Sequence, residues 1–175
     1  FLLEMTRCAL DTVPHGTQVW LNIGDSGPDF LQEAAAMGVE GIYHVCRLRE
    51  GTDTELRPED RIATMRHAKE AGLKVFTCCE PIGPEHTVDE LVDSVFLALD
   101  LGLDINAAMP RVAVPGSPMA HLGTISQERL METMKNAKAV VRTGDFGSCC
   151  TMVLYSTSGR DKYVTQFNCD FPMQE

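Results

Sequence analysis

Apolar residues recur along the chain in two alternating patterns, which predict alternating helices and strands. Helical spacing of apolar residues runs through 1–12, through a segment that begins at Pro28, and through segments that end before Gly72 and Gly102. Short, nearly continuous apolar runs separate these segments and are typical of buried strands. The predicted strands are 18–23, 39–46, 73–79 and 103–107.

The predicted helices and strands repeat with a period that indicates a parallel sheet. Gly38, Gly72 and Gly102 each precede an apolar run, and a repeat of about 30 residues is the length of one βα unit. Consecutive units place their strands side by side through right-handed crossovers. Four such strands form an open doubly wound sheet or half of an eight-stranded barrel, and we expect an α/β fold that is a partial TIM-type barrel with outer helices.

Helix and strand boundaries are predicted from local signals. Ser26, three residues before Asp29, is the predicted N-cap of the helix that begins at Pro28. Thr87 with Glu90 predicts a capping box, and Thr124 with Gln127 predicts the cap of a further helix. The strand 73–79 is expected to break at 80–84, where two prolines and a glycine follow Glu80.

The last part of the chain has a different pattern. Segments 150–156 and 162–167 each resemble a strand, and the intervening 157–161 resembles a turn, so we expect a β-hairpin and not another βα unit. The expected division is a barrel domain over 1–142 and a divergent tail over 143–175.

Composition restricts the class of protein. The 175 residues carry a formal net charge of −10, so we expect neither nucleic acid nor an anionic membrane as a partner. No apolar run has the roughly 18 residues of a membrane helix, and residues 1–10 lack the basic region of a signal peptide. The seven cysteines include the adjacent pairs Cys78–Cys79 and Cys149–Cys150, which suit neither a disulfide framework nor a zinc site. We expect a soluble, cytoplasmic protein.

Polar residues gather where the predicted strands end. In a parallel sheet these ends share one edge, so their side chains would form a pocket for a charged ligand or a metal. The residues are Asn22, Asp25, His44, Cys46, Arg47, Arg49, Glu50, Cys78, Cys79, Glu80, His86, Asn106 and Arg111.

Several of these residues have two interpretations. Glu80 has few structural roles at a strand end and is interpreted as a ligand-binding residue. His44 either lines a pocket or is a core histidine, and the cysteines of the strands are interpreted as packed thiols. Arg47 and Arg49 either contribute to a site or belong to a solvated loop. Arg61 lies on the first turn of its helix, where the sequence favours solvent exposure.

Four segments in succession resemble the carboxyl-terminal half of biotin-synthase-like radical S-adenosylmethionine enzymes. The resemblance covers roughly 19–137 and is strongest to the branch related to maturation of the iron-guanylylpyridinol hydrogenase cofactor. The segments are HVCRLREGTDT (44–54), RPEDRIATMRHAKEAGLKV (57–75), CCEPIGPEHTVDELV (78–92) and MPRVAVPGSPMAHLG (109–123).

The resemblance implies a barrel that binds S-adenosylmethionine and a 4Fe–4S cluster. Such enzymes cleave adenosylmethionine reductively to a 5′-deoxyadenosyl radical, which abstracts hydrogen from a small-molecule substrate in cofactor biosynthesis. Their Cys-x-x-x-Cys-x-x-Cys cluster motif is absent from these 175 residues. We therefore expect a fragment that is inactive alone, with the cluster ligands on a missing amino-terminal half of the barrel.

The resemblance also implies roles for particular residues, although it assigns no catalytic residue. Arg61 would approach the adenosylmethionine carboxylate. Glu80, Ile82 and Gly83 would pass the adenine, in a loop that departs from the family's Gly-x-Ile-x-Gly-x-x-Glu pattern and leaves Glu85 without an assigned role. The segment 109–118 would close over cofactor and substrate. The residues predicted to bind the cofactor are Asn22, His44, Arg47, Arg61, Glu80, Ile82, Gly83, Met109 and Arg111.

Two other functions are consistent with the same residues. One is a metal-dependent lyase or aldolase-type barrel in which His44, Glu80 and His86 bind a divalent ion. The other is a non-catalytic α/β binding domain.

Overall fold

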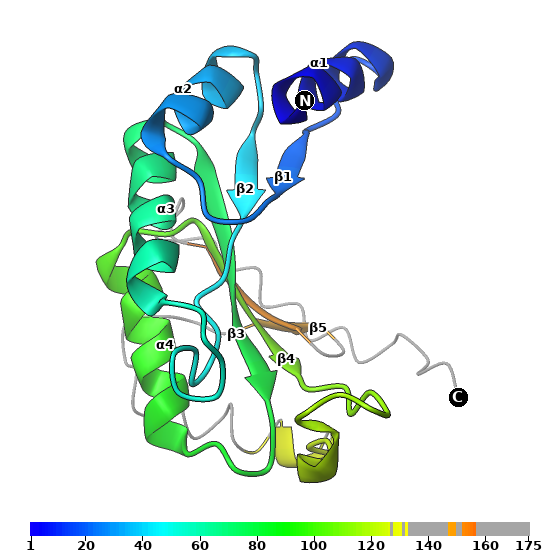
Figure 1. Cartoon of the computed structure of the whole chain (residues 1–175), viewed down its shortest axis with the longest axis vertical. Helices are drawn as coiled ribbons and strands as arrows, with labels where there is room; N and C mark the ends of the chain where they lie inside the picture. The colour runs from blue at the N-terminus through cyan, green and yellow to red at the C-terminus, as the bar shows by residue number, and fades with distance from the viewer. Residues whose placement is uncertain (127, 131, 133–146, 150–151, 157–175) are drawn as a thin grey trace.

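Four parallel strands form the centre of the fold. The computed structural model describes residues 1–126, 128–130, 132, 147–149 and 152–156. Within them, β1, β2, β3 and β4 lie side by side in sequence order and run in one direction (Figure 1). The strands are β1 (Trp20–Asn22), β2 (Gly41–Tyr43), β3 (Lys74–Ile82) and β4 (Ile105–Pro110). The predicted parallel α/β fold is therefore confirmed.

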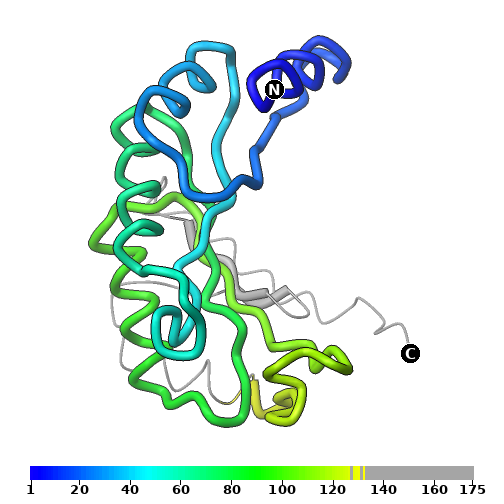
Figure 2. Tube along the Cα trace, viewed as in Figure 1, coloured from blue at the N-terminus to red at the C-terminus, as the bar shows by residue number. Residues whose placement is uncertain are grey.

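Helices precede each of these strands. They are α1 (Leu2–Thr12), α2 (Pro28–Ala36), α3 (Pro58–Glu70) and α4 (Val88–Asp100), and a short 3₁₀ helix, η1 (Ala120–Leu122), follows β4. The path of the chain in Figure 2 places α2, α3 and α4 in one layer along one side of the sheet. Gly38, Gly72 and Gly102 adopt φ values of 100°, 82° and 61° directly after α2, α3 and α4. Only glycine adopts this conformation without strain, so these residues end the helices.

The predicted helix caps are correct at α4 and wrong at two other places. Thr87 and Glu90 form the complete capping box of α4. The N-cap of α2 is Gly27 instead of Ser26, because the Ser26 hydroxyl donates to the Gly24 carbonyl. The Thr124 hydroxyl donates to the Arg111 carbonyl, and Ser126 Oγ accepts from the Arg129 N–H. Gln127 lies outside the described residues.

Strands β3 and β4 extend further than predicted. The break expected at 80–84 is wrong, because β3 continues through the cis Glu80–Pro81 bond to Ile82, which pairs with Pro110. Ile82 is fully buried, and its carbonyl accepts from the Arg111 N–H at 2.8 Å, so core packing holds these residues in the sheet. Asn106 consequently lies inside β4 and not at its carboxyl end.

Two antiparallel strands complete the described sheet, which has the order β1-β2-β3-β4-β6-β5. Strand β6 (Met152–Ser156) pairs with the outer edge of β4 and with β5 (Gly147–Cys149). It lies within the predicted strand 150–156. The other predicted strand, 162–167, and the domain boundary predicted near 142 lie outside the described residues.

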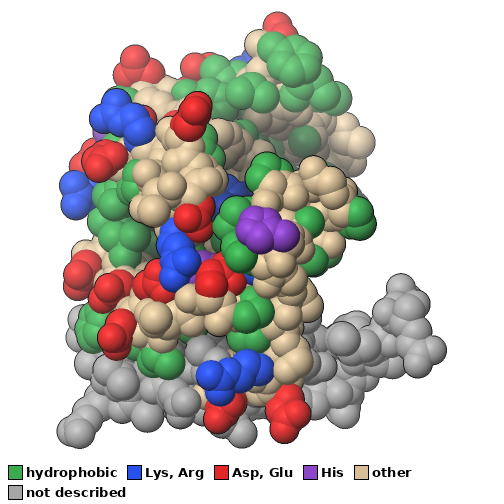
Figure 3. Space-filling view, turned by 60° about the horizontal axis from the view of Figure 1, so that its bottom comes forward, with side chains coloured by type: hydrophobic (Ala, Val, Ile, Leu, Met, Phe, Trp, Pro, Cys, Tyr) green, Lys and Arg blue, Asp and Glu red, His purple; other side chains and the backbone are tan. Residues whose placement is uncertain are grey.

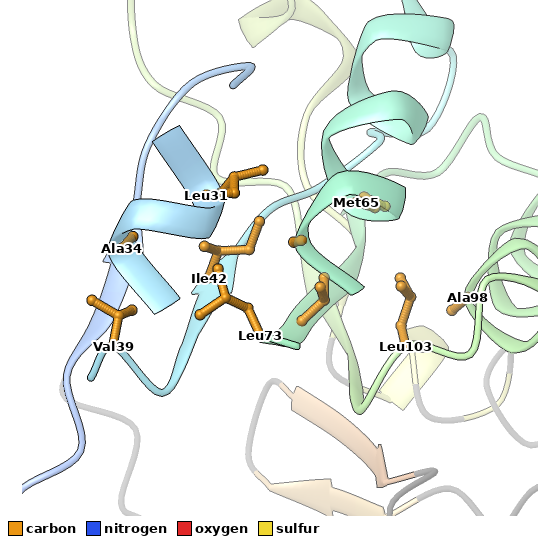
Figure 4. Packing of buried hydrophobic residues seen from close by; sticks show 10 residues of the cluster. Leu31, Ala34, Val39, Ile42, Met65, Leu73, Ala98 and Leu103 are labelled. Atoms are coloured by element: carbon orange, nitrogen blue, oxygen red, sulfur yellow. The ribbon is translucent and has the colours of Figure 1, made fainter. Parts of the chain in front are cut away.

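The hydrophobic core between sheet and helices consists of two clusters. Figure 4 shows residues of the larger one, in which Leu31 of α2 and Met65 of α3 pack over Ile42 of β2. The second cluster lies nearer the carboxyl ends and joins Cys79 and Ile82 to Leu91 of α4.

A buried polar row lies between these two clusters. The His44 N–H donates to the Phe76 carbonyl, which places His44 beside Thr77, and Thr77 pairs with Asn106. All three are buried, and Thr77 falls between Val75 of the larger cluster and Cys79 of the second.

The opposite face of the sheet is turned away from the layer of helices. Side chains alternate between the faces of a strand, so Tyr43, Phe76 and Cys78 lie on this second face, where they form a smaller cluster with Val45 and Ala107. None of the helices in the described part of the chain is long and apolar enough to cross a membrane.

Candidate functional site

The carboxyl ends of β1 to β4 meet at one end of the molecule, as the parallel order requires. Figure 3, in which this end is turned toward the viewer, shows acidic and basic side chains next to one another. Three groups of contacts lie among them. We call these groups the β2–α3 network, the inner-face group and the rim clamp, and we define each by its residues below.

The β2–α3 network consists of Asp25, His44, Glu50 and Arg61. Arg61 Nη1 donates to Asp25 Oδ1 at 2.9 Å, and Arg61 Nε donates to Glu50 Oε1 at 3.3 Å. The Arg61 side chain is only 11% exposed, so the expectation that it faces solvent is wrong. The two carboxylates direct its guanidinium inward, toward the ends of β1 and β2.

His44 contributes a buried ring nitrogen, Nε2, to this network. Its side chain is 2% exposed, and Nε2 lies 3.2 Å from Asp25 Oδ1. Apart from this contact with Asp25, Nε2 has no hydrogen-bond partner in the described part of the chain. Burial, followed by the nearby Arg61 charge, lowers the pKa of His44, which favours the neutral imidazole at pH 7.

The inner-face group consists of Tyr43, Arg47 and Glu80 on the face away from the helices. The Tyr43 hydroxyl donates to Glu80 Oε2 at 3.1 Å, and Arg47 Nε lies 3.5 Å from Glu80 Oε1. The ring of Phe76 contacts the Tyr43 ring edge-on at a centroid distance of 5.0 Å. Burial raises the pKa of Tyr43 and of the neighbouring Cys78 thiol, so both stay protonated.

The rim clamp consists of Gly83, Glu85 and Arg111. Arg111 binds Glu85 through two parallel contacts, one of them from Nη2 to Oε2 at 2.9 Å, and its Nε donates to the Gly123 carbonyl at 3.0 Å. The hydrogen bonds from Arg111 lower the pKa of Glu85 to about 2. A side chain at Gly83 would collide with both partners. A side chain at this position would therefore require the two partners of the ion pair to shift.

Arg49 connects the loop after β2 to the start of α4. It donates to both oxygens of Glu90, at 2.6 and 3.2 Å, and to the Glu85 carbonyl. The hydrogen bond from Arg49 lowers the pKa of Glu90 to about 2. Arg49 has a φ of 58°, a strained conformation for a residue with a side chain. The contacts of its side chain hold it there, and both Arg47 and Arg49 thus have defined carboxylate partners.

The remaining predicted site residues occupy different positions around this end. Asn22 is exposed on β1, in register with Tyr43 of β2. Met109 packs against the cluster on the inner face, whereas the Ile82 side chain belongs to the helix-facing core, so only its backbone reaches the rim. The predicted residues share one end of the sheet but divide between its two faces.

The three residues proposed as metal ligands are not brought together. His44 lies against Asp25, and Glu80 binds Tyr43. His86 Nδ1 accepts from the Gly83 N–H at 2.9 Å. Over the described ranges there is no group of three His, Cys, Asp or Glu residues able to hold a metal ion. The metal-dependent lyase hypothesis therefore lacks its site in this part of the chain.

An iron–sulfur cluster does not fit the described cysteines either. Cys78 and Cys79 are adjacent on β3 and belong to clusters on opposite faces of the sheet. Cys8 is exposed on α1, and Cys46 lies in the loop after β2. These thiols cannot converge on one cluster.

The β2–α3 network has the chemistry to recognise an aminocarboxylate, the end group of adenosylmethionine. The Arg61 guanidinium donates hydrogen bonds suited to a carboxylate, and the Asp25 carboxylate accepts from an ammonium group. Nε2 of neutral His44 offers a further polar contact beside them. A ligand carboxylate would compete with Asp25 and Glu50 for Arg61.

Sequence reasoning missed Tyr43 and Glu85. Tyr43 is adjacent to His44 in the predicted strand. Side chains alternate between the faces of a strand, so the sequence could have shown that Tyr43 lies on the face opposite to His44, together with Val45. Glu85 is found only through its partner Arg111, which is 26 residues away. No local signal predicts that pairing.

Comparisons with known proteins bear on the fold. No protein-family model matches the sequence, and no curated protein does. The structure resembles that of coproporphyrinogen III oxidase (HemN) from Escherichia coli, described as a radical SAM enzyme, with a TM-score of 0.64 and 11% sequence identity. The match covers 94% of this chain and 41% of HemN, so this chain spans less than half of that protein's length. At this identity the likeness concerns the fold alone.

Proposed function

We propose that the chain is part of a radical SAM enzyme and binds the aminocarboxylate of adenosylmethionine in the β2–α3 network. The observation that carries this proposal is the coincidence of two features at one place. The four ordered parallel strands resemble the fold of a radical SAM enzyme, and their carboxyl ends hold a buried arginine between two carboxylates beside a buried histidine nitrogen that contacts Asp25.

In this proposal each group of contacts has its own task. Arg61 donates to the ligand carboxylate, and Asp25 accepts from the ammonium group of the ligand. Glu50 holds the Arg61 guanidinium in place through its contact with Nε. Glu80, on the inner face with Tyr43 and Arg47, contacts a small-molecule substrate. The rim clamp keeps Gly83 and the loop after β4 in a fixed position near the adenine.

Adenosylmethionine bound here would take up one electron from a 4Fe–4S cluster, and cleavage of its C–S bond would release methionine and supply a 5′-deoxyadenosyl radical for hydrogen abstraction in cofactor biosynthesis. The described residues do not hold the 4Fe–4S cluster, so we propose that its ligands belong to a missing amino-terminal half of the barrel. The finer assignment is to the biotin-synthase-like branch related to hydrogenase cofactor maturation. It rests on the sequence resemblance alone.

Isothermal titration of the purified chain with adenosylmethionine tests the binding site. We expect Arg61→Met to weaken binding at least tenfold, because it removes a charged donor aimed at the ligand carboxylate. The matched control is Arg57→Met, because Arg57 lies one turn earlier and its side chain is mostly exposed. Equal affinity in wild type and Arg61→Met, with both folded by circular dichroism, would contradict the proposal and favour a non-catalytic binding domain.

Reconstitution with iron and sulfide tests the proposal that the cluster ligands lie outside this chain. We expect the 175-residue chain to show no visible cluster absorption, because its described cysteines do not converge. A stoichiometric, stable 4Fe–4S spectrum from this chain alone would overturn the assignment of the ligands to another part of the barrel.

A further inference from the structure

Arg47 differs from Arg49, Arg61 and Arg111 in how many of its donors are used. Each of the other three donates hydrogen bonds to two or more groups, and their side chains are 30%, 11% and 7% exposed. The Arg47 side chain is 45% exposed, and its contact within the described ranges is that of Nε with Glu80 Oε1 at 3.5 Å. Its two terminal nitrogens, Nη1 and Nη2, therefore have no partner among the described residues.

The backbone of Arg47 is fixed although its side chain is half exposed. Its N–H donates to Glu50 Oε2 at 3.0 Å, and Glu50 in turn accepts from Arg61 of α3. The next N–H along the chain, that of Leu48, donates to the Glu80 carbonyl of β3 at 2.8 Å. The guanidinium is thus attached at a fixed point beside β3, which lowers the entropy cost of binding a ligand there.

The unused nitrogens of Arg47 suit an anion. The guanidinium is planar, and its two terminal nitrogens present parallel N–H groups that match the two oxygens of a carboxylate or a phosphate. Glu80 contacts Nε of Arg47 and also accepts from the Tyr43 hydroxyl at 3.1 Å. Arg47 can therefore bind the anionic group of a ligand through Nη1 and Nη2 while its contact with Glu80 is kept.

Apolar side chains lie across β3 from Arg47. Met109 of β4 and Phe76 of β3 pack against the cluster on the inner face and are only partly buried. In the loop after β4, Val112 and Val114 are 76% and 54% exposed. Arg47 follows β2, and β3 lies between β2 and β4 (Figure 1). At a strand spacing of about 4.8 Å, Arg47 and Met109 are about 10 Å apart, which is the length of an alkyl chain of about eight carbon atoms.

We propose that Arg47 binds the anionic group of the substrate and that the substrate is an organic acid with an apolar body. The carboxylate or phosphate of this acid binds the terminal nitrogens of Arg47, and its carbon chain lies across β3 toward Met109. The inference rests on the proposed function, which places a small-molecule substrate on the inner face. It adds the chemical class of the substrate and the residue that selects it.

Titration with four matched probes tests the preference for an anion. Octanoate, octyl phosphate, octylammonium and octanol share an alkyl chain and differ in the head group. NMR titration of the isotope-labelled 175-residue chain follows the Nε–H signal of Arg47. We expect octanoate or octyl phosphate to bind about tenfold more tightly than octanol, because a charged hydrogen-bond pair forms. The tighter of the two anions shows whether the site takes a carboxylate or a phosphate.

Substitution of Arg47 tests the residue itself. Arg47→Gln should lower the affinity for the preferred anion to about that of octanol, whereas Arg57→Gln, at a mostly exposed arginine, should bind it as the wild type does. Unchanged affinity in Arg47→Gln, with its fold intact by circular dichroism, would overturn the proposal. Octanol that binds wild type as tightly as both anions would overturn it as well. Tighter binding of octylammonium would also overturn it and would assign recognition to Glu80.

These titrations separate the inference from the binding of adenosylmethionine. None of them contains adenosylmethionine, and the comparison of head groups uses the wild-type chain, so it decides the question without any variant. Adenosylmethionine binding without a preference for the anionic probes rejects only this inference. Anion binding that depends on Arg47, in a chain that does not bind adenosylmethionine, rejects only the adenosylmethionine site.

Discussion

The rim clamp and the β2–α3 network both contain an arginine between loops at the same end of the sheet, but they differ in how fully their polar atoms are paired. In the clamp, both oxygens of Glu85 accept from Arg111, whose remaining nitrogen donates to a backbone carbonyl. In the network, Arg61 is shared between Asp25 and Glu50, and the neighbouring His44 Nε2, apart from its contact with Asp25, has no hydrogen-bond partner among the described residues.

In the proposed function, this difference distinguishes the structural role of the clamp from the binding role of the network. A closed, bidentate pair has no capacity left for a ligand and is best suited to fixing two loops. A network whose arginine is shared and whose buried histidine nitrogen contacts only Asp25 has donors and acceptors that a ligand could engage. Arg111, predicted from the sequence as a cofactor-binding residue, has the geometry of a positioning residue, and Arg61 has that of a binding residue.

The largest expected effect is that of Arg111→Ala on stability. The change leaves the Glu85 carboxylate without its partner and removes the bond to Gly123, and breaking a buried pair costs about 3 kcal/mol. Urea denaturation of the variant measures this loss in the free energy of unfolding. Arg57→Ala is the control, because it breaks an exposed pair worth less than about 1 kcal/mol.

The same variants test the comparison directly. Arg111→Ala should reduce stability more than affinity for adenosylmethionine, and Arg61→Met should reduce affinity. A loss of affinity in Arg111→Ala without a loss of stability would place Arg111 in the binding site and remove the distinction between the two groups.

The next largest effect is expected for Gly83, the glycine of the rim clamp. Gly83→Ala places a methyl group against the Arg111 guanidinium and the Glu85 carboxylate, and overpacking of this kind costs about 2 kcal/mol. Gly24→Ala is the matched control, because a methyl group at Gly24 would meet no atom within 4 Å. Equal urea midpoints for the two variants would show that the clamp adjusts freely and does not fix the loop.

A smaller effect is expected in acid. The folded-state pKa values of Glu85 and Glu90 are lowered from 4.5 to about 2 by hydrogen bonds from Arg111 and Arg49. Because the unfolded carboxyls take up protons first, their contribution is complete above pH 4.5 and is lost as the pH falls toward 2. Urea midpoints measured between pH 5 and 2.5 should decline less in Glu85→Gln than in wild type. Parallel curves would show that the clamp contributes nothing to acid stability.

The smallest effect is that of His44. Its pKa is lowered mainly by burial, so the unfolded state binds a proton before the folded state, and stability falls as the pH drops below about 6.5. NMR titration of the ring should place its midpoint below that value, and His44→Gln should flatten the stability profile between pH 7 and 5.5. Exposed His15→Gln provides the control, and a midpoint at or above 6.5 would mean that the network is open to solvent.

Local sequence signals predicted the architecture because they depend on neighbouring residues. The glycines after α2, α3 and α4 end those helices, and the Thr87–Glu90 box begins α4 as expected. The predictions failed where tertiary contacts decide. Ile82 extends β3 past a proline because its side chain is buried in the core. Gly27 replaces Ser26 as the cap because the serine hydroxyl turns back to Gly24.

The candidate site was predicted in position but not in arrangement. The parallel order brings His44, Glu80 and Arg111 to one end, as the strand pattern indicated. The division of the site residues between the two faces of the sheet depends on where each strand ends. The predicted carboxyl ends of β2, β3 and β4 differ from the observed ends by several residues. The pairing of Glu85 with Arg111 joins loops after different strands, so no single segment of sequence encodes it.

The polar row of His44, Thr77 and Asn106 has a consequence for how mutations combine. On β3 it lies between Val75, which shares a cluster with Met65, and Cys79, which shares a cluster with Leu91. Strain introduced in one cluster is therefore poorly transmitted to the other. We therefore expect that the two hydrophobic clusters can be repacked independently. The losses in the free energy of unfolding from truncating one residue in each cluster should add.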